Sequence, residues 1–294
     1  MEYKCGCSRV QMITRPLRYA GSWYEADPIF LERQLNGFFA AVAKEELAPD
    51  DISALVVPHA GYAYSGAAAA DAYKVVMGKK VERIFLLGPS HHIGFSGVAF
   101  PRVDFFETPF GKLSIDQEVI AALRQEPHFL EQEAAHSIEH SLEMQLPFIK
   151  KIFPNAALVP LLVGSLQNQQ EVETIAASIK KYLREDDLVI ISSDFTHYGP
   201  RFSFMPESEK MKEKIQEFDT RAYDYLEQLD VSGLLNFYQE TGVTICGIYP
   251  IAILLALLPQ KIKVSLLAYY TSQDVVKNDP EHSVSYMAIA FSKK

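Results

Sequence analysis

Six runs of apolar and β-branched residues recur along the chain, and stretches with helical spacing separate most of them. Continuous apolar runs of this length are typical of strands buried on both faces of a sheet. The runs cover residues 54–57, 83–87, 158–163, 188–192, 264–270 and 284–291. The alternation predicts an α/β fold with a central, largely parallel or mixed sheet flanked by helices.

Helical spacing places apolar side chains on one face of each intervening stretch. The predicted helices span residues 30–43, 66–77, 115–124, 141–152, 172–183, 208–229 and 246–258. A mostly polar stretch separates the last two apolar runs, so these two strands could pair antiparallel. No repeat or linker-like shift in composition divides the chain. We therefore expect an N-terminal tail over residues 1–12 and a single domain over residues 13–294.

Composition and charge narrow the classes of function. The chain has 294 residues, of which 48% are hydrophobic, and this is enough for a large core. Its formal net charge of -9 argues against a general nucleic-acid binder, because such proteins rely on clustered Lys and Arg. The longest apolar segment, at 245–258, is shorter than the roughly 18 residues of a membrane span and contains a proline, so we expect a core helix and no membrane partner.

The cysteines and the N-terminal residues indicate in which cellular compartment the protein is expected. Cys5, Cys7 and Cys246 form no disulfide framework, and residues 1–12 lack the apolar stretch of a secretory signal. Cys5 and Cys7 also lack the second pair that a structural zinc site would need, so a tail with two thiols is the simpler interpretation. We expect a cytoplasmic protein.

Histidines follow three of the predicted strands. His59 follows the first run in VVPHAGYAYSG, His91 follows the second in FLLGPSHH, and Asp194 and His197 follow the fourth in VIISSDFTHYG. Ligands bind beyond the carboxyl ends of the strands in open α/β sheets. A single histidine after a strand is usually a hydrogen-bonded loop residue, but three such strand ends indicate a site.

The chemistry of these residue types leaves several possibilities open. Imidazole suits iron, copper, zinc and nickel. Cys246, at the start of the apolar helix, could supply a thiolate favoured by the helix dipole, or could be a small buried hydrophobe. A hydrolase with Cys246 or Ser90 as nucleophile ranks lower, because no G-x-S-x-G motif is present. Nucleotide binding has no support, because neither G-x-G-x-x-G nor a Walker lysine loop occurs.

Eight segments, in order along nearly the whole chain, resemble the Memo family. They are AGSWY (20–24), VPHAGYAYSG (57–66), LGPSHH (87–92), EHSLEMQLPF (139–148), LLVG (161–164), SSDFTHYG (192–199), TICGIYP (244–250) and SVSY (283–286). The family is similar in fold to the LigB-type extradiol dioxygenases, which are non-haem iron enzymes.

The resemblance implies a role for each motif residue. His59, His91 and Cys246 would bind a metal ion, with iron or copper expected and zinc possible. His140 and His197 match two histidines that orient substrate and move protons in the dioxygenases, with Asp194 beside His197. In the dioxygenases a carboxylate stands where this chain has the thiol, and a thiolate shifts the metal preference toward soft ions. His92 would be a neighbour that packs or hydrogen-bonds.

Three functions therefore compete. The leading hypothesis is a metal-dependent protein with dioxygenase-like redox chemistry on an unknown small molecule, in which His197 exchanges protons and His140 positions the substrate. The alternative is a binding module that holds a peptide or small ligand in the same cleft without turnover, and the third is a zinc- or cysteine-dependent hydrolase. Either of the first two would use aromatic walls, expected from Tyr62, Tyr64, Phe95, Phe195 and Tyr198.

Overall fold

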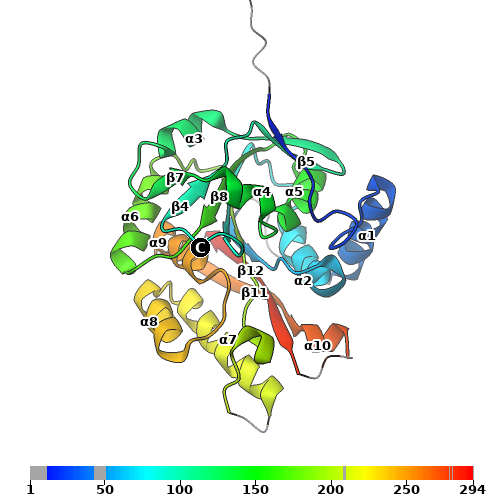
Figure 1. The fold of residues 1–294 in the computed structure, drawn as a ribbon, viewed down its shortest axis with the longest axis vertical. Coiled ribbons are helices and arrows are strands. Elements are labelled where there is room, and N and C mark those ends of the chain that lie inside the picture. Colours follow the sequence, from blue (N-terminus) through cyan, green and yellow to red (C-terminus); the bar gives the residue numbers. More distant parts are fainter. Residues whose placement is uncertain (1–11, 43–50, 208–209, 278, 280, 294) are drawn as a thin grey trace, which may run out of the picture.

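A mixed sheet runs through the centre of the structure (Figure 1). The structure is a computed structural model that describes residues 12–42, 51–207, 210–277, 279 and 281–293. Within these residues nine strands form the main sheet in the order β10-β12-β2-β9-β3-β8-β4-β7, and β11 pairs with β12 beside that path. The strands are β2 (Ile52–Val57), β3 (Arg83–Pro89), β4 (Val98–Phe100), β7 (Phe129–Glu131), β8 (Ala157–Val163), β9 (Leu188–Ser192), β10 (His197–Tyr198), β11 (Ile262–Thr271) and β12 (Ser283–Lys293).

The centre of this sheet is parallel. Strands β2, β9, β3 and β8 pair in parallel, whereas β12 and β4 are antiparallel to their neighbours β2 and β8. All residues of β3 and β9 are buried, which explains why their sequences are continuously apolar. The predicted α/β fold with a mixed sheet is confirmed. Each of the six apolar runs forms a strand, and β11 and β12 pair antiparallel as expected.

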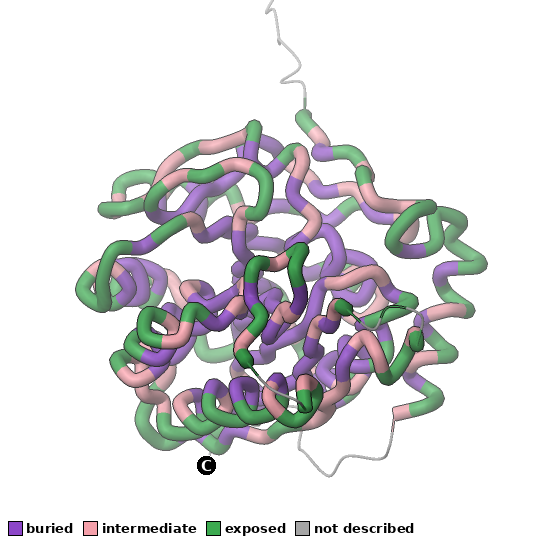
Figure 2. The backbone as a smooth tube through the Cα atoms, turned by 60° about the horizontal axis from the view of Figure 1, so that its bottom comes forward, coloured by how far each residue is buried: buried purple, intermediate pink, exposed green. Residues whose placement is uncertain are grey.

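Helices cover both faces of the sheet, and the buried residues lie between them (Figure 2). The connection through α2 (Tyr62–Lys74) leads from β2 to β3, whereas α6 (Gln169–Lys180) leads back from β8 to β9. Right-handed crossovers in opposite directions place their helices on opposite faces. The contacts agree, because α2 packs against β2 and β12, and α9 (Ile248–Leu257) packs against α6, β3 and β9.

The other helices complete these layers, and four of them correspond to predicted helices with shifted ends. They are α1 (Pro28–Ala41), α3 (Gln117–Leu123), α4 (Glu133–Ile138), α5 (Leu146–Ile152), α7 (Met211–Glu227), α8 (Val231–Thr241) and α10 (Ser272–Val275), with 3-10 turns η2 (Glu143–Gln145) and η3 (Pro200–Phe202). The predicted helix over 141–152 begins late, as η2 followed by α5. The end of the predicted helix over 30–43 includes residue 43, which lies outside the described residues.

Short elements were not predicted. A separate three-stranded sheet contains β1 (Thr14–Arg15), β5 (Phe105–Thr108) and β6 (Gly111–Ser114). Strands β5 and β6 lie in the segment between β3 and β8 that also holds β4 and β7. Strands of two to four residues carry too few positions for an alternating pattern to be recognised. Helices α4, α8 and α10 were also missed.

The long apolar segment is α9, and eight of its ten residues are buried, which confirms the core-helix interpretation. In the part of the chain that the structure describes, no helix is both long and apolar enough to cross a membrane. Residues 1–11, with Cys5 and Cys7, lie outside the described residues. The tail over 1–12 and the single domain over 13–294 stay predictions.

Candidate metal centre

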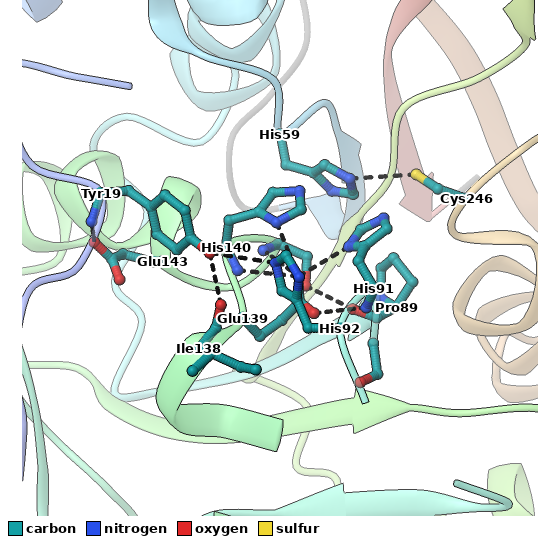
Figure 3. Close-up of polar contacts among 12 residues, drawn as sticks. Tyr19, His59, Pro89, His91, His92, Ile138, Glu139, His140, Glu143 and Cys246 are labelled. Carbon is teal, nitrogen blue, oxygen red and sulfur yellow. Dashed lines mark hydrogen bonds and ion pairs between the residues drawn. The ribbon is translucent and has the colours of Figure 1, made fainter. Parts of the chain in front are cut away.

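Three distant segments bring His59, His91 and Cys246 together. His59 follows β2, His91 follows β3, and Cys246 lies in the loop just before α9. One ligating atom from each lies within 4.8 Å of the other two (Figure 3). Cys246 Sγ and His59 Nε2 are 3.3 Å apart. The expected convergence at the carboxyl ends of the parallel strands therefore exists, although 187 residues separate the first and last of the three.

The tautomer of His59 is fixed by a buried hydroxyl. Its Nδ1 lies 3.0 Å from Ser192 Oγ. Ser192 donates its only hydroxyl hydrogen to the carbonyl of Ser141, at 2.6 Å. Ser192 can therefore only accept from His59, so Nδ1 carries the hydrogen and Nε2 offers its lone pair toward Cys246. Burial, and then the neighbouring His91, lower the pKa of His59 well below its ordinary value. The ring is neutral at pH 7, which is the form that binds metals.

The thiol of Cys246 is half-buried and lies beside the end of β9. The Asp194 backbone N–H donates to Sγ at 3.2 Å. Burial, and then the charge of Asp194, raise the pKa of the Cys246 thiol. Cys246 precedes the first helical residue, Ile248, by two positions, so the expected effect of the helix dipole on the thiolate acts against that of burial.

His140 packs against the same cluster from the loop after α4. Its ring stacks on that of His91 with centroids 4.5 Å apart, and Trp23 lies 4.7 Å away on another side. Burial, and then His59 and His91, lower the pKa of His140 to about 2. The His140 ring lies between the pocket and the two candidate metal-binding histidines, His59 and His91. Because this ring is neutral, it can contact a molecule in the pocket without adding positive charge beside a metal ion.

His197 is oriented by backbone carbonyls rather than by a carboxylate. Its Nδ1 donates to the carbonyls of Phe195 and Thr244, at 2.8 and 2.9 Å. Because both partners can only accept, Nδ1 carries the hydrogen and Nε2 is the basic nitrogen. Burial lowers the pKa of His197, and the charge of Asp194 partly opposes that effect. Asp194 itself accepts from the backbone N–H of His59 at 2.8 Å, so it holds the His59 loop and acts on His197 through its charge alone.

Comparisons with known proteins show the family of this chain. A family model described as Memo-like protein matches residues 15–290, a range that contains all six candidate residues. The chain belongs to the Memo family. It is 35% identical to Protein MEMO1 of Homo sapiens over 297 residues, covering 96% of this chain and 98% of that protein. It is also 35% identical over 300 residues to the Protein memo-1 homolog of Caenorhabditis elegans, covering 97% and 84%.

A solved structure supports the fold of this Memo-family chain. An uncharacterized protein from Escherichia coli K12 superimposes with a TM-score of 0.54 at 13% identity, covering 81% of this chain and 99% of that one. At this identity the similarity shows the fold alone.

The candidate centre of this Memo-family protein lies in a pocket of about 880 Å³. His59, His91, His140, Asp194, His197 and Cys246 all line it. Among the expected aromatic walls only Tyr64 does so. Tyr62, at the start of α2, and Phe195, in the loop after β9, are buried and point into the core. The aromatic side chains that do line the pocket are Trp23, Tyr64, Phe202, Tyr238 and Tyr286.

Two further pocket residues of this Memo-family protein escaped the sequence reasoning. Arg201 and His282 line the outer part of the pocket. Nothing in their local sequence marks them. Trp23, in contrast, belongs to the AGSWY segment that resembles the family, so the resemblance could have identified it. His92 lies beside the cluster and its Nε2 is 3.3 Å from the Tyr19 hydroxyl, in keeping with the neighbour role expected of it.

Proposed function

We propose that this Memo-family protein holds an iron or copper ion with His59, His91 and Cys246 and uses it for redox chemistry on a small molecule. The observation that carries the proposal is the convergence of these three ligating atoms within 4.8 Å of one another. The pocket beside them is large enough for a small organic ligand.

The donor set fits the proposed ions. Two imidazoles and one thiolate are ligands for copper, zinc and thiolate-bound iron, whereas Mg²⁺ and Ca²⁺ prefer oxygen. His59 presents an unprotonated Nε2 toward the sulfur, as required of a ligand. Three protein ligands would leave coordination positions open to the pocket, and a bound ion would supply one-electron and Lewis-acid chemistry there. Zinc remains compatible with the same donors.

The residues around the centre have separate tasks. His197, with Nε2 free and Asp194 nearby, would take up a proton from the ligand, since the carboxylate charge favours the protonated ring. The rings of His140 and Trp23, which contact each other with centroids 4.7 Å apart, would form one aromatic wall against the ligand.

Metal analysis of protein purified without added metal tests this proposal. We expect about one equivalent of iron or copper, lost in His59→Ala and Cys246→Ala and retained in His128→Asn, a histidine outside the pocket. The metal-loaded protein should consume oxygen with at least one member of a panel of phenols and thiols. Metal that persists in both ligand variants would refute the ligand assignment.

A second candidate is the binding of a small anionic ligand without turnover. Arg201 lines the outer pocket, its guanidinium lies 4.7 Å from the Phe202 ring, and no described carboxylate forms an ion pair with it. A cation on an aromatic wall favours an anionic ring compound. This candidate predicts that benzoate binds the wild-type protein, that Arg201→Gln no longer binds it, and that the uncharged analogue benzamide does not bind. These results together with the absence of oxygen uptake would favour binding without turnover.

The third candidate is a zinc- or cysteine-dependent hydrolase, and its cysteine-dependent form gains no support. A nucleophilic cysteine needs a lowered pKa, and burial raises that of Cys246. Ser90 donates its hydroxyl to the Ile93 carbonyl at 2.7 Å and does not line the pocket.

A further inference from the structure

The carboxylate of Glu139 is surrounded by N–H groups. Its Oε1 lies 2.8 Å from His91 Nδ1 and accepts the backbone N–H groups of His140 and Ser141, both at 3.0 Å. Its Oε2 accepts the backbone N–H of His91 at 2.6 Å. The residue is 2% exposed, so water does not compete for these oxygens. Figure 3 shows Glu139 directly beneath the histidine cluster.

A second metal site is the obvious alternative for this carboxylate. Ligating atoms of His91, Glu139 and His140 also lie within 4.8 Å of one another. However, both carboxylate oxygens already accept hydrogen bonds, three of them from backbone N–H groups that have no other role here. His140 Nδ1 is 3.2 Å from Oε1 but lacks hydrogen-bond geometry. A cation at this point would have to displace these donors, so Glu139 is an orienting group and not a ligand.

The hydrogen bonds determine which nitrogen of His91 can bind an ion. Three backbone N–H donors favour the ionised carboxylate, which can only accept. His91 Nδ1 must then carry the ring hydrogen, and Nε2 is the only lone pair that remains. We infer that Glu139 is a positioning residue that locks His91 in the tautomer required of a metal ligand. This inference rests on the proposed function, because it assigns His91 to the ion.

Two hydrogen bonds hold the segment that carries Glu139, one from Arg15 and one to the loop of His91. Arg15 donates from Nη2 to the Glu139 carbonyl at 2.7 Å. Ser141 donates its hydroxyl to the Pro89 carbonyl at 2.8 Å, just before His91. The carboxylate and the ring that it orients therefore sit on two loops that are bonded to each other, which keeps their distance fixed.

The first test needs no metal. Long-range ¹H–¹⁵N spectra of the metal-free protein report which ring nitrogen of each histidine carries hydrogen, and His91→Ala identifies the His91 signals. We expect only the Nδ1–H form in the wild type and a mixture of tautomers in Glu139→Gln, with the single form restored in part by Glu139→Asp. A wild-type ring protonated on Nε2 overturns the inference even if the variants do not fold.

The second test is a double-mutant cycle on Zn(II) affinity, measured by competition with a chromogenic chelator. Loss of an orienting carboxylate typically lowers metal affinity by about 10- to 100-fold. Glu139→Gln should show this loss in the wild-type background and none when added to His91→Ala, because it acts through that ring. Equal losses in both backgrounds would overturn the inference.

A buried carboxylate elsewhere provides the matched control. Asp187 forms a buried ion pair with Arg83 at 2.6 Å and precedes β9 at the end of the strand opposite the site. Asp187→Asn should lower stability and leave Zn(II) affinity unchanged. If wild-type protein binds no Zn(II), the proposed metal site fails, whereas the inference about Glu139 is still decided by the His91 tautomer.

Discussion

The buried imidazole of His136 makes stability depend on pH in a way that can be measured. His136 lies on α4 and is 1% exposed. Its Nε2 is 2.9 Å from the Ala99 carbonyl, so it carries the hydrogen and donates. Burial is the main cause that lowers its pKa to about 3, and the hydrogen bond to Ala99 only partly opposes it. The folded protein thus holds a neutral ring where the unfolded chain would be protonated.

The sign and size of the effect follow from this difference. Between the unfolded pKa of about 6.5 and the folded pKa of about 3, the unfolded state binds the extra proton, so the free energy of unfolding falls as pH falls. The slope from one such group is about 1.36 kcal/mol per pH unit. Acidification from pH 6.5 to pH 4 should therefore remove about 3 kcal/mol through His136 alone.

Urea unfolding at half-unit steps from pH 7 to pH 4 measures this contribution in wild type and His136→Gln. Glutamine can still donate to Ala99 but does not titrate, so the variant should be less stable at pH 7 and show a pH profile shallower by about 3 kcal/mol. Phe106→Leu, which alters a neighbour whose ring centroid is 6.3 Å away, should lower stability by the same amount at every pH. Parallel profiles for wild type and His136→Gln would refute the reasoning.

Three further predictions concern the metal centre. Metal binding to Cys246 should release a proton, so metal affinity should fall as pH falls. Cys246→Ser should lower the affinity for Cu(I) and Zn(II), measured by competition titration, far more than that for Mn(II). Equal losses of affinity for the three ions would show that sulfur is not a ligand. His197→Ala should keep its metal content and lower turnover by about 100- to 10,000-fold, and loss of metal would instead make it a ligand. Gly247→Ala should lower Zn(II) affinity, because its new Cβ would meet the Ser193 side chain at 2.4 Å and displace the loop that carries Cys246; unchanged affinity would show that the loop adapts.

The sequence predicts best where burial is uniform. The strands of the sheet centre are apolar on both faces, so their runs stand out and their carboxyl ends locate His59 and His91. Helix α8 was missed although Asp230 caps its start and Gly242 ends it in the left-handed conformation. Those signals are local and could have been recognised.

Other features depend on tertiary structure and leave no local signal. Sequence proximity to a histidine suggested Tyr62 as a pocket wall, but its hydroxyl donates to the Met144 carbonyl inside the core. Glu139 stands out in the sequence only as the first residue of the EHSLEMQLPF segment, because its role depends on the loop of His91 lying against it. The effect of burial, which raises the pKa of the Cys246 thiol, likewise depends on tertiary structure.

The three candidate ligands come from separate loops, so a metal ion could bind with all three only when the whole domain is folded. No short segment of the chain contains two of them, so a fragment or a partly unfolded state would lack the binding site. An ion that binds only the native state raises its stability by RT ln(1 + [L]/Kd), or about 2.7 kcal/mol at a hundredfold excess over Kd. Supply of the metal in the cell would then set the lifetime of the protein against proteolysis, in addition to any activity.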